Sequence, residues 1–345
     1  MVAIDILKFP TSSPADTTPL ERLLAAGYDA SQILAVIGKT EGNGCVNDFS
    51  RTLASTVWEP KIPKDAVTIF SGGTEGVLCP HVTFILRAHK NSPTGLSASV
   101  GRTRELSPHE IGTVDHAQEV AQTVARLIND IGVAVEQVQL VLIKCPLLTS
   151  TKLEMIRAEG RQPITTDTYE SMAKSRYASA IGIARALGEL EESQISDSLK
   201  SENSWSAKAS CSSGAELDDC HIFILASNTN VSGKLHLRAV SKPMQDAIDA
   251  AALLDLLSQV RKDDGEVVQV FTKAEADPRG QVRGNRHTMN TDSDLHSTRH
   301  ARAAVGGLIA GLVGDTQIYV SGGAEGQGPP GGGSLCLVYR KPYNL

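Results

Sequence analysis

Short apolar runs and longer amphipathic stretches alternate along the chain. Three of the short runs are rich in β-branched residues and lead into a lysine, so each predicts a buried strand with Lys39, Lys144 or Lys273 close to its end. These runs are residues 33–37, 139–143 and 267–271. Apolar residues at helical spacing predict helices over residues 117–131, 169–190 and 243–260, and the polar stretch 191–208 is expected to form a surface loop.

A short Ser-Gly motif occurs three times. It reads SGGTEG from Ser71, SGGAEG from Ser321 and, in weaker form, SSGAEL from Ser212. Apolar runs of strand composition follow every copy and precede the first and third, which predicts that each serine lies on a tight connection between strands. One such turn would carry little weight, but three copies in the order strand, Lys, helix, strand, Ser, strand indicate three structural units.

Polar stretches near residues 91–95 and 232–234 separate the expected units. The units cover residues 1–92, 95–233 and 238–345. Each contains strands and helices, so the predicted fold is α+β with three like repeat units. If the units pack around a pseudo-threefold axis, their lysines and serines converge on one site. Repetition that serves stability alone is the alternative interpretation.

Arginines lie in or near the segment between the lysine and the serine of every unit, at Arg51, Arg176 and Arg302, and Arg299 competes for the last of these positions. Converging Lys and Arg side chains would form a cationic pocket, which favours a planar anionic ligand with repeated carbonyls. The same charges would lower the pKa of a buried lysine. A neutral lysine can take the proton that makes serine a nucleophile, so the pattern predicts Ser-Lys chemistry.

The middle unit departs from the other two. Lys39 and Lys273 each precede an acid by two residues, Glu41 and Glu275, whereas Lys144 does not. We therefore predict that Lys39 and Lys273 stay charged and bind substrate while Lys144 acts as the base. Equally low pKa values for all three lysines would remove this reason for choosing Lys144.

The middle motif is also the divergent copy, with Ser213 in place of one glycine and Leu217 in place of another. Ser212 is therefore the predicted nucleophile. Cys211 is a competing thiol, but adjacent residues of a strand face opposite sides, so its side chain should point away from the pocket. The acids that recur beside the glycine turns, Glu75 and Glu325, could act as acids or could cap backbone amides.

Composition narrows the classes of function. The chain has 345 residues, 41% of them hydrophobic, with a formal net charge of -6. It contains no block of basic residues and no apolar run long enough to span a bilayer, so neither nucleic acid nor a membrane is an expected partner. Six cysteines without a CxxC pair indicate reduced thiols, and the first twenty residues do not resemble a secretion signal. We expect a cytoplasmic protein.

Several long strings resemble cyanuric acid hydrolases, and the likeness runs almost end to end. They are GKTEGNGCVND from Gly38, SGGTEGVL from Ser71, KCPLL from Lys144, TTDTYES from Thr165 and VSGGAE from Val320. Barbiturases share this family, so the resemblance implies ring-opening amide hydrolysis more firmly than it implies the substrate. It also implies that the sheets of three like units enclose a central barrel with the helices outside.

The resemblance implies a catalytic dyad of Ser212, the nucleophile, and Lys144, the base. The residues implied to hold the substrate ring are Arg51, Arg176, Arg302, Ser71, Gly72, Ser213, Ser321 and Gly322, and the charge pattern adds Lys39 and Lys273. The implied reaction opens cyanuric acid to carboxybiuret, which loses carbon dioxide to give biuret. The alternatives are a barbiturase, which would open barbituric acid to ureidomalonate, and a cyclic-imide binding protein without catalytic activity.

The resemblance further implies a structural divalent cation, magnesium or calcium, because a Gly/Pro loop can turn backbone carbonyls toward a hard ion. The residues implied for this cation are Glu275, Ala324, Gln327, Gly328, Pro329 and Gly332. No cofactor is expected for catalysis itself. The expected partners are a small planar cyclic imide as substrate and further copies of the chain in a homo-oligomer, such as a tetramer.

Overall fold

The computed structural model describes residues 3–89, 95–227 and 236–342. These residues form three four-stranded sheets and one two-stranded hairpin. In order across each sheet, the strands are β1 (Ile4–Pro10), β4 (His81–Arg87), β2 (Ile33–Thr40) and β3 (Val67–Gly72); β5 (Leu96–Arg102), β8 (His221–Ser227), β6 (Val138–Pro146) and β7 (Ala209–Gly214); and β9 (Leu237–Ser241), β14 (Leu335–Arg340), β10 (Glu266–Ala274) and β13 (Tyr319–Gly322). The hairpin pairs β11 (Gln281–Val282) with β12 (Asn285–Arg286).

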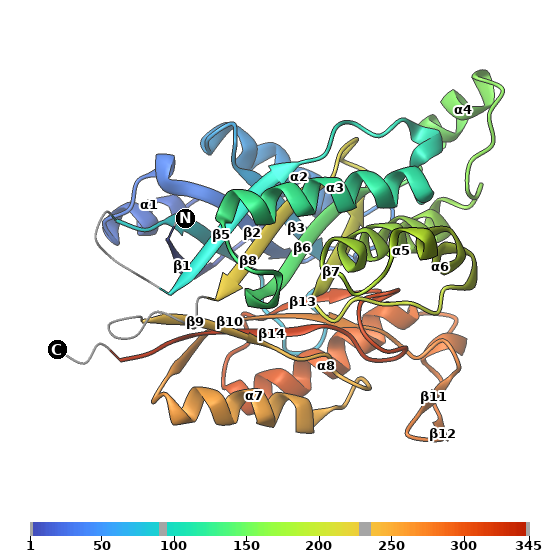
Figure 1. Ribbon diagram of the computed structural model, residues 1–345. Coiled ribbons are helices and arrows are strands. Elements are labelled where there is room, and N and C mark those ends of the chain that lie inside the picture. The colour runs from blue at the N-terminus through green and yellow to red at the C-terminus, as the bar shows by residue number, and fades with distance from the viewer. Residues whose placement is uncertain (1–2, 90–94, 228–235, 343–345) are drawn as a thin grey trace.

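The three sheets share one connectivity. In each, the strand that carries the lysine (β2, β6 or β10) has an antiparallel neighbour on one side and a parallel neighbour on the other. A parallel pair needs a crossover connection, which helices provide here. The described residues contain the helices α1 (Pro19–Ala25), α2 (Phe49–Trp58), α3 (Val114–Ile131), α4 (Ser150–Ala158), α5 (Thr168–Ala186), α6 (Ile195–Ser201), α7 (Ala250–Lys262) and α8 (Ser297–Val313). Figure 1 shows α3 and α5 beside the second sheet and α7 and α8 beneath the third.

The apolar core has one central part and several outer parts. The central cluster takes side chains from all three sheets, including Ile6, Leu142 and Phe271. Outer clusters fill the space between each sheet and its helices. Because both faces of the sheets are covered, the lysine-bearing strands are buried along nearly their whole length. This burial explains why their sequences are continuous apolar runs rather than alternating patterns.

The α+β class and the three lysine-bearing strands are confirmed, since the runs 33–37, 139–143 and 267–271 lie in β2, β6 and β10. Two local predictions are wrong. The helix expected from residue 243 begins at Ala250, after Asp249 accepts a hydrogen bond from the backbone of Ala252 and caps it. The stretch 191–208 is not only loop, because it contains α6, whose Ile195 is buried.

The sheets use residues 4–87, 96–227 and 237–340. The expected unit ends at residues 92 and 233 lie outside the described residues, so the division into three units stays a prediction. Within the described residues, no helix is both long enough and apolar enough to cross a membrane.

Candidate active site

Each lysine lies beside a serine across a parallel strand pair. The register pairs Lys39 with Ser71, Lys144 with Ser212, and Lys273 with Ser321. Residues paired in this way point to the same face of the sheet. The serines therefore lie in the last residues of β3, β7 and β13, not on the connections where the sequence predicted them.

The serines of the three pairs meet at one small cavity, whose lining does not include Lys39, Lys144 or Lys273. Its walls consist of Arg51, Ser71, Gly72, Arg176, Ser212, Ser213, Arg302, Ser321 and Gly322, together with Gly44 and Met172. The structure thus brings together the serines, glycines and arginines that the sequence nominated for substrate binding. The free volume is about 10 Å³, room for about one water molecule, so the surrounding side chains must move to admit a larger ligand.

Local structure explains how the arginines reach this cavity. Asp48 caps α2 by accepting a hydrogen bond from the backbone of Ser50, which places Arg51 in the first turn. Arg176 lies in α5 and Arg302 in α8, and both are buried. Arg302, not Arg299, therefore occupies the third arginine position.

Two of the three lysines donate hydrogen bonds directly to their serines. Lys39 Nζ lies 3.2 Å from Ser71 Oγ and 3.1 Å from the carbonyl of Gly72. Lys273 Nζ lies 3.0 Å from Ser321 Oγ and also donates to the carbonyls of Gly322 and Cys211. In both pairs the serine oxygen accepts from the lysine, so its own O–H is free to donate to a ligand.

The middle pair differs. Lys144 Nζ donates to the carbonyl of Phe70 at 2.9 Å and to that of Ser213 at 3.1 Å, and it lies 3.4 Å from a carboxylate oxygen of Glu216. Ser212 Oγ makes a long hydrogen bond of 3.5 Å to the carbonyl of Ile143, and the hydroxyl of Tyr319 is a further neighbour. No lysine hydrogen bond to Ser212 is found among the described residues, and hydrogen bonds at such sites often tighten only when a ligand is bound.

All three lysines are at most 1% exposed, and burial lowers the pKa of each. The pKa of Lys144 falls to about 8 and that of Lys273 to about 7, while that of Lys39 falls well below its ordinary value. The prediction that only Lys144 has a low pKa is wrong, and so is its reason. Glu41 is exposed beyond the end of β2, whereas Lys144 does have a carboxylate neighbour, Glu216.

Carboxylates hold two of the arginines in forked ion pairs. Arg302 binds both oxygens of Glu75 at 2.6 and 2.8 Å, and Arg176 binds both oxygens of Glu325 at 2.7 and 2.8 Å. Burial opposes ionisation of both acids, but the arginine charges hold the pKa of Glu75 and of Glu325 below the ordinary range. Arg51 instead donates to the carbonyls of Cys45 and Ser213.

Sequence reasoning missed two residues at this site. Glu216 was not singled out, although its place in the middle copy of the motif was the available signal. The hydroxyl of Tyr319 is buried without a hydrogen-bond partner, and its neighbours Ser212 and Ser71 partly offset the rise in pKa that burial causes. Tyr319 could have been found because it precedes Ser321 by two residues on the same strand, and so faces the same side.

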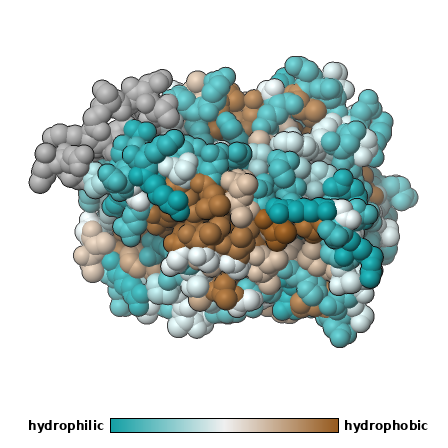
Figure 2. Space-filling view, turned by 90° about the horizontal axis from the view of Figure 1, so that it is seen from below, coloured by the Kyte–Doolittle hydropathy of each residue, from teal (hydrophilic) through white to brown (hydrophobic). Residues whose placement is uncertain are grey.

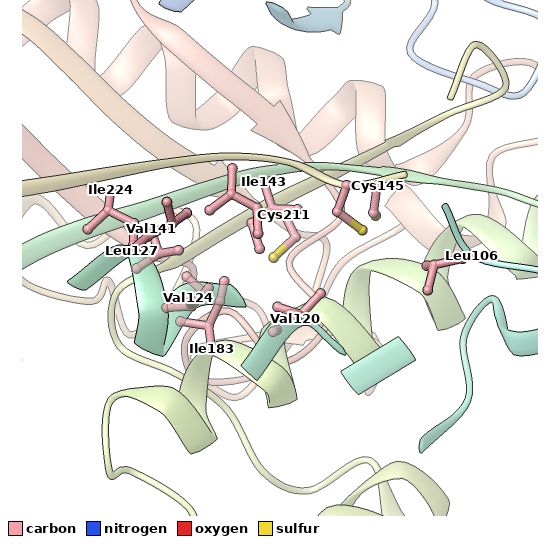
Figure 3. Packing of buried hydrophobic residues seen from close by; sticks show 14 of the residues in the cluster. Leu106, Val120, Val124, Leu127, Val141, Ile143, Cys145, Ile183, Cys211 and Ile224 are labelled. Atoms are coloured by element: carbon pink, nitrogen blue, oxygen red, sulfur yellow. The ribbon is translucent and has the colours of Figure 1, made fainter. Parts of the chain in front are cut away.

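Cys211 points away from the cavity. Figure 3 shows Cys211 and Cys145 among apolar side chains such as Val120, Val124 and Ile183. Burial raises the pKa of the Cys211 thiol well above its ordinary value. A buried thiol of this kind is inert, which agrees with the expectation that Cys211 is not a nucleophile.

The residues predicted to hold a cation lie around a loop next to the third serine. Glu275 is mostly buried and accepts a hydrogen bond from the backbone of Gly331, and no salt bridge is found for it among the described residues. Burial and the nearby charge of Glu325 raise the pKa of Glu275. The side chain of Gln327 already bonds the backbone of Cys211 and Gly323, which leaves its backbone carbonyl for an ion. Within the described residues no group of three His, Cys, Asp or Glu side chains could hold a metal.

A larger cavity of about 490 Å³ adjoins the site and shares Arg176 with it. Its walls include Tyr169 and His296, whose hydroxyl and Nδ1 lie 2.9 Å apart, and the paired carboxylate Glu325. The Arg176–Glu325 ion pair therefore lies between the larger cavity and the small one.

The chain is similar to known proteins over nearly its whole length. Residues 5–340 match the family described as amidohydrolase ring-opening protein. The chain is 69% identical to a cyanuric acid amidohydrolase of a Sarocladium species over 98% of this chain and 99% of that protein. It is 55% identical to the cyanuric acid amidohydrolase of Pseudonocardia dioxanivorans over 99% of both chains.

Solved structures of similar proteins have the same fold. One cyanuric acid hydrolase superposes with a TM-score of 0.91 at 41% identity, covering 99% of this chain and all of that chain. A second, from A. caulinodans, superposes with a TM-score of 0.92 at 40% identity over 99% of both chains.

Proposed function

Because this chain belongs to the family of amidohydrolase ring-opening proteins, and is thus a cyclic amide hydrolase, we propose that it opens the ring of cyanuric acid. The observation that carries the proposal is the convergence of three serines and three arginines on one cavity, with each serine paired to a lysine on the neighbouring strand. Cyanuric acid carries three equivalent carbonyls around a planar ring. Three similar sets of donors fit that ligand better than they fit an unsymmetrical one.

Ser212 is the proposed nucleophile and Lys144 the proposed base. Neutral Lys144 takes the Ser212 proton while the serine oxygen bonds to a ring carbonyl carbon. The C–N bond of the ring then breaks, and the ammonium of Lys144 returns the proton to the departing nitrogen. Water releases carboxybiuret from the serine, and loss of carbon dioxide gives biuret. Donors beside the attacked carbonyl stabilise the developing oxyanion, typically by about 3 to 4 kcal/mol.

The other two pairs have a binding role in this proposal. Ser71 and Ser321 accept hydrogen bonds from Lys39 and Lys273, so each can direct its O–H to a ring carbonyl. The arginines Arg51, Arg176 and Arg302, with Gly72, Ser213 and Gly322, complete the walls that would hold the ring. Their positive charges favour an anionic form of the substrate.

We also propose that the three like units pack around a pseudo-threefold axis, with the sheets forming a central barrel. The identical strand orders and the shared central core support this arrangement. The threefold order then matches the symmetry of the proposed substrate.

A structural magnesium or calcium ion is part of the proposal. Glu275 is a largely buried carboxylate for which no salt bridge is found among the described residues, although the charges of Arg176 and Lys273 act on it, and a divalent cation would supply a direct positive partner. Backbone carbonyls of Ala324, Gln327, Gly328, Pro329 and Gly332 are the proposed further ligands. The ion would hold the loop after the third serine and takes no part in the reaction.

We propose a homo-oligomer, such as a tetramer, in the cytoplasm. Figure 2 shows an apolar band on the face seen from below in Figure 1, where α7 and α8 lie. Each of these helices exposes a leucine, Leu254 and Leu312. All six cysteines are free thiols, which fits a reducing compartment.

The test is release of biuret and carbon dioxide from cyanuric acid, measured beside turnover of barbituric acid. Ser212→Ala and Lys144→Ala should each abolish turnover, while the matched variant Ser71→Ala should keep measurable turnover with a raised KM. Preference for barbituric acid would shift the assignment to a barbiturase. Ligand binding without product from either ring would refute the catalytic proposal.

A further inference from the structure

The carboxylate of the repeated motif has a different partner in the middle unit. Glu75 and Glu325 each form a forked ion pair with an arginine from another sheet's helices, Arg302 and Arg176 respectively. By the same pattern Glu216 would pair with Arg51. Instead Glu216 lies 3.4 Å from Lys144 Nζ, and neither of its carboxylate oxygens has a hydrogen-bond partner.

The backbone of the motif explains this difference. The last residue of the motif is a glycine with φ of +67° in the first and third copies, Gly76 and Gly326. Leu217 takes that place in the middle copy, and a residue with a β-carbon disfavours this left-handed conformation. The middle turn therefore folds differently, and Gly214 is not among the glycines with positive φ.

The side chain that lies beside the third residue of the motif also differs between the copies. A β-carbon at Gly73 or Gly323 would lie 2.6 Å from the guanidinium of Arg302 or Arg176. A β-carbon at Gly214 would lie 2.2 Å from a carboxylate oxygen of Glu216. The glycine that makes room for an arginine in two units thus makes room for the carboxylate in the third.

The charges around Lys144 determine the ionisation of Glu216 and its effect on the lysine. Burial alone would raise the pKa of Glu216, but the charges of Lys144 and Arg51 hold it below its ordinary value, so Glu216 is an anion. The charges of Arg51 and Asp48 also act on Lys144, and Glu216 is the largest of the influences that favour its charged form. Arg51 opposes that charge and makes no ion pair with Glu216.

We propose that Glu216 is a positioning residue for Lys144, whose ammonium it stabilises while that group carries the proton taken from Ser212. The proposal rests on the Ser212–Lys144 chemistry proposed above. The Ser212 proton moves to Lys144 and then to the leaving ring nitrogen, while Glu216 stays ionised throughout. The charges of Glu75 and Glu325 also favour the charged forms of Lys39 and Lys273. Arginines occupy both oxygens of each of these acids, however, and in the described part of the chain neither acid forms an ion pair with its own lysine, as Glu216 does with Lys144.

The test compares Glu216→Gln with Glu75→Gln, the same change in the same motif position of the first unit. Removing an opposite charge 3.4 Å away should lower the pKa of Lys144, by about 1 to 3 units for partners this close. In Glu216→Gln the inflection on the acid side of the kcat/KM profile should move to lower pH by the same number of units. Its kcat should fall about 10- to 100-fold, with KM changed less than about threefold. Glu75→Gln should raise KM and leave the inflection in place.

A direct titration separates this inference from the proposed reaction. Protein labelled with ¹³C at lysine Cε is titrated by NMR, and the Lys144 signal is assigned from its loss in Lys144→Arg. An unchanged Lys144 titration in Glu216→Gln would overturn the role of Glu216 whether or not the enzyme opens cyanuric acid. Absence of turnover in the unmodified protein would instead overturn the proposed function. Should Glu216→Gln fail to fold, Leu217→Gly restores the glycine of the other copies, and should shift the Lys144 titration in the same direction.

Discussion

Arg302→Lys tests whether the forked ion pair, rather than the positive charge alone, holds this wall of the site. Arg302 makes three hydrogen bonds from its guanidinium, two to Glu75 and one of 2.9 Å to the carbonyl of Asn43. Lysine has a single Nζ and can replace about one of them. Hydrogen bonds of charged groups contribute about 1.5 to 3 kcal/mol each, so the loss of two costs about 3 to 6 kcal/mol before relaxation.

Arg299 reduces this loss because it also contacts Glu75, at 3.1 Å, and so keeps the carboxylate partly paired. We therefore expect Arg302→Lys to lower the free energy of unfolding by about 2 to 4 kcal/mol and to raise KM about tenfold or more. Arg299→Lys is the matched control, since it changes the same residue type on the same helix beside the same carboxylate. Its side chain is 36% exposed, and exposed pairs contribute less than about 1 kcal/mol.

Denaturant unfolding and steady-state kinetics on both variants provide the measurement. Equal destabilisation by Arg302→Lys and Arg299→Lys would refute the reading that the buried fork sets the position of Arg302. So would a large loss of stability with an unchanged KM, because the arginine would then be structural only.

Other predictions concern the base, the glycines and the cation. The value of kcat/KM should rise about tenfold per pH unit on the acid side and level off above about pH 8, because in the proposed mechanism only neutral Lys144 accepts the serine proton. A flat profile, once the substrate's own ionisation has been titrated separately, would contradict this. Gly323→Ala places a β-carbon 2.6 Å from Arg176 at a φ of +76°, and should cost about 2 kcal/mol of stability or more, whereas Gly307→Ala, with no atom within 4 Å of the new β-carbon, should be neutral or stabilising in thermal melts. A chelator should lower the melting temperature of the unmodified protein but not that of Glu275→Gln, and equal responses would count against the cation.

The parts of the fold that follow from local pattern could be predicted. The lysine-bearing strands were found because β-branched apolar runs specify buried strands, and the three motif copies identified the serines beside them. Residues 243–249 were assigned to a helix wrongly, because apolar spacing continued upstream of Asp249, which caps the helix. The short helix α6 was missed because its sequence is mostly polar, and Ile195 and Leu199 are its only apolar residues that pack against the core.

The electrostatics of the site could not be predicted from sequence neighbours. Glu41 follows Lys39 by two residues, but β2 ends at Thr40, and the acid leaves the strand for solvent. Glu216 lies 72 positions from Lys144 in the sequence, yet the parallel register of β6 with β7 places its motif beside the lysine. Contacts of this kind depend on how a turn folds after a strand ends, which periodicity does not describe.

The proposed threefold site has to meet two conflicting requirements. A ring with three equivalent carbonyls is held best by three equivalent donors, but if all three serines were reactive, each would also need a base free to change its charge. In the first and third sheets the lysine donates to its serine, and an arginine occupies the motif carboxylate that follows. In the middle copy of the motif Leu217 replaces the last glycine, Glu216 lies beside the lysine, and no lysine donor to Ser212 is found among the described residues. In the proposed mechanism, a few side-chain differences in one copy therefore confine the chemistry to one serine, while the other two copies keep the geometry proposed to hold the ring.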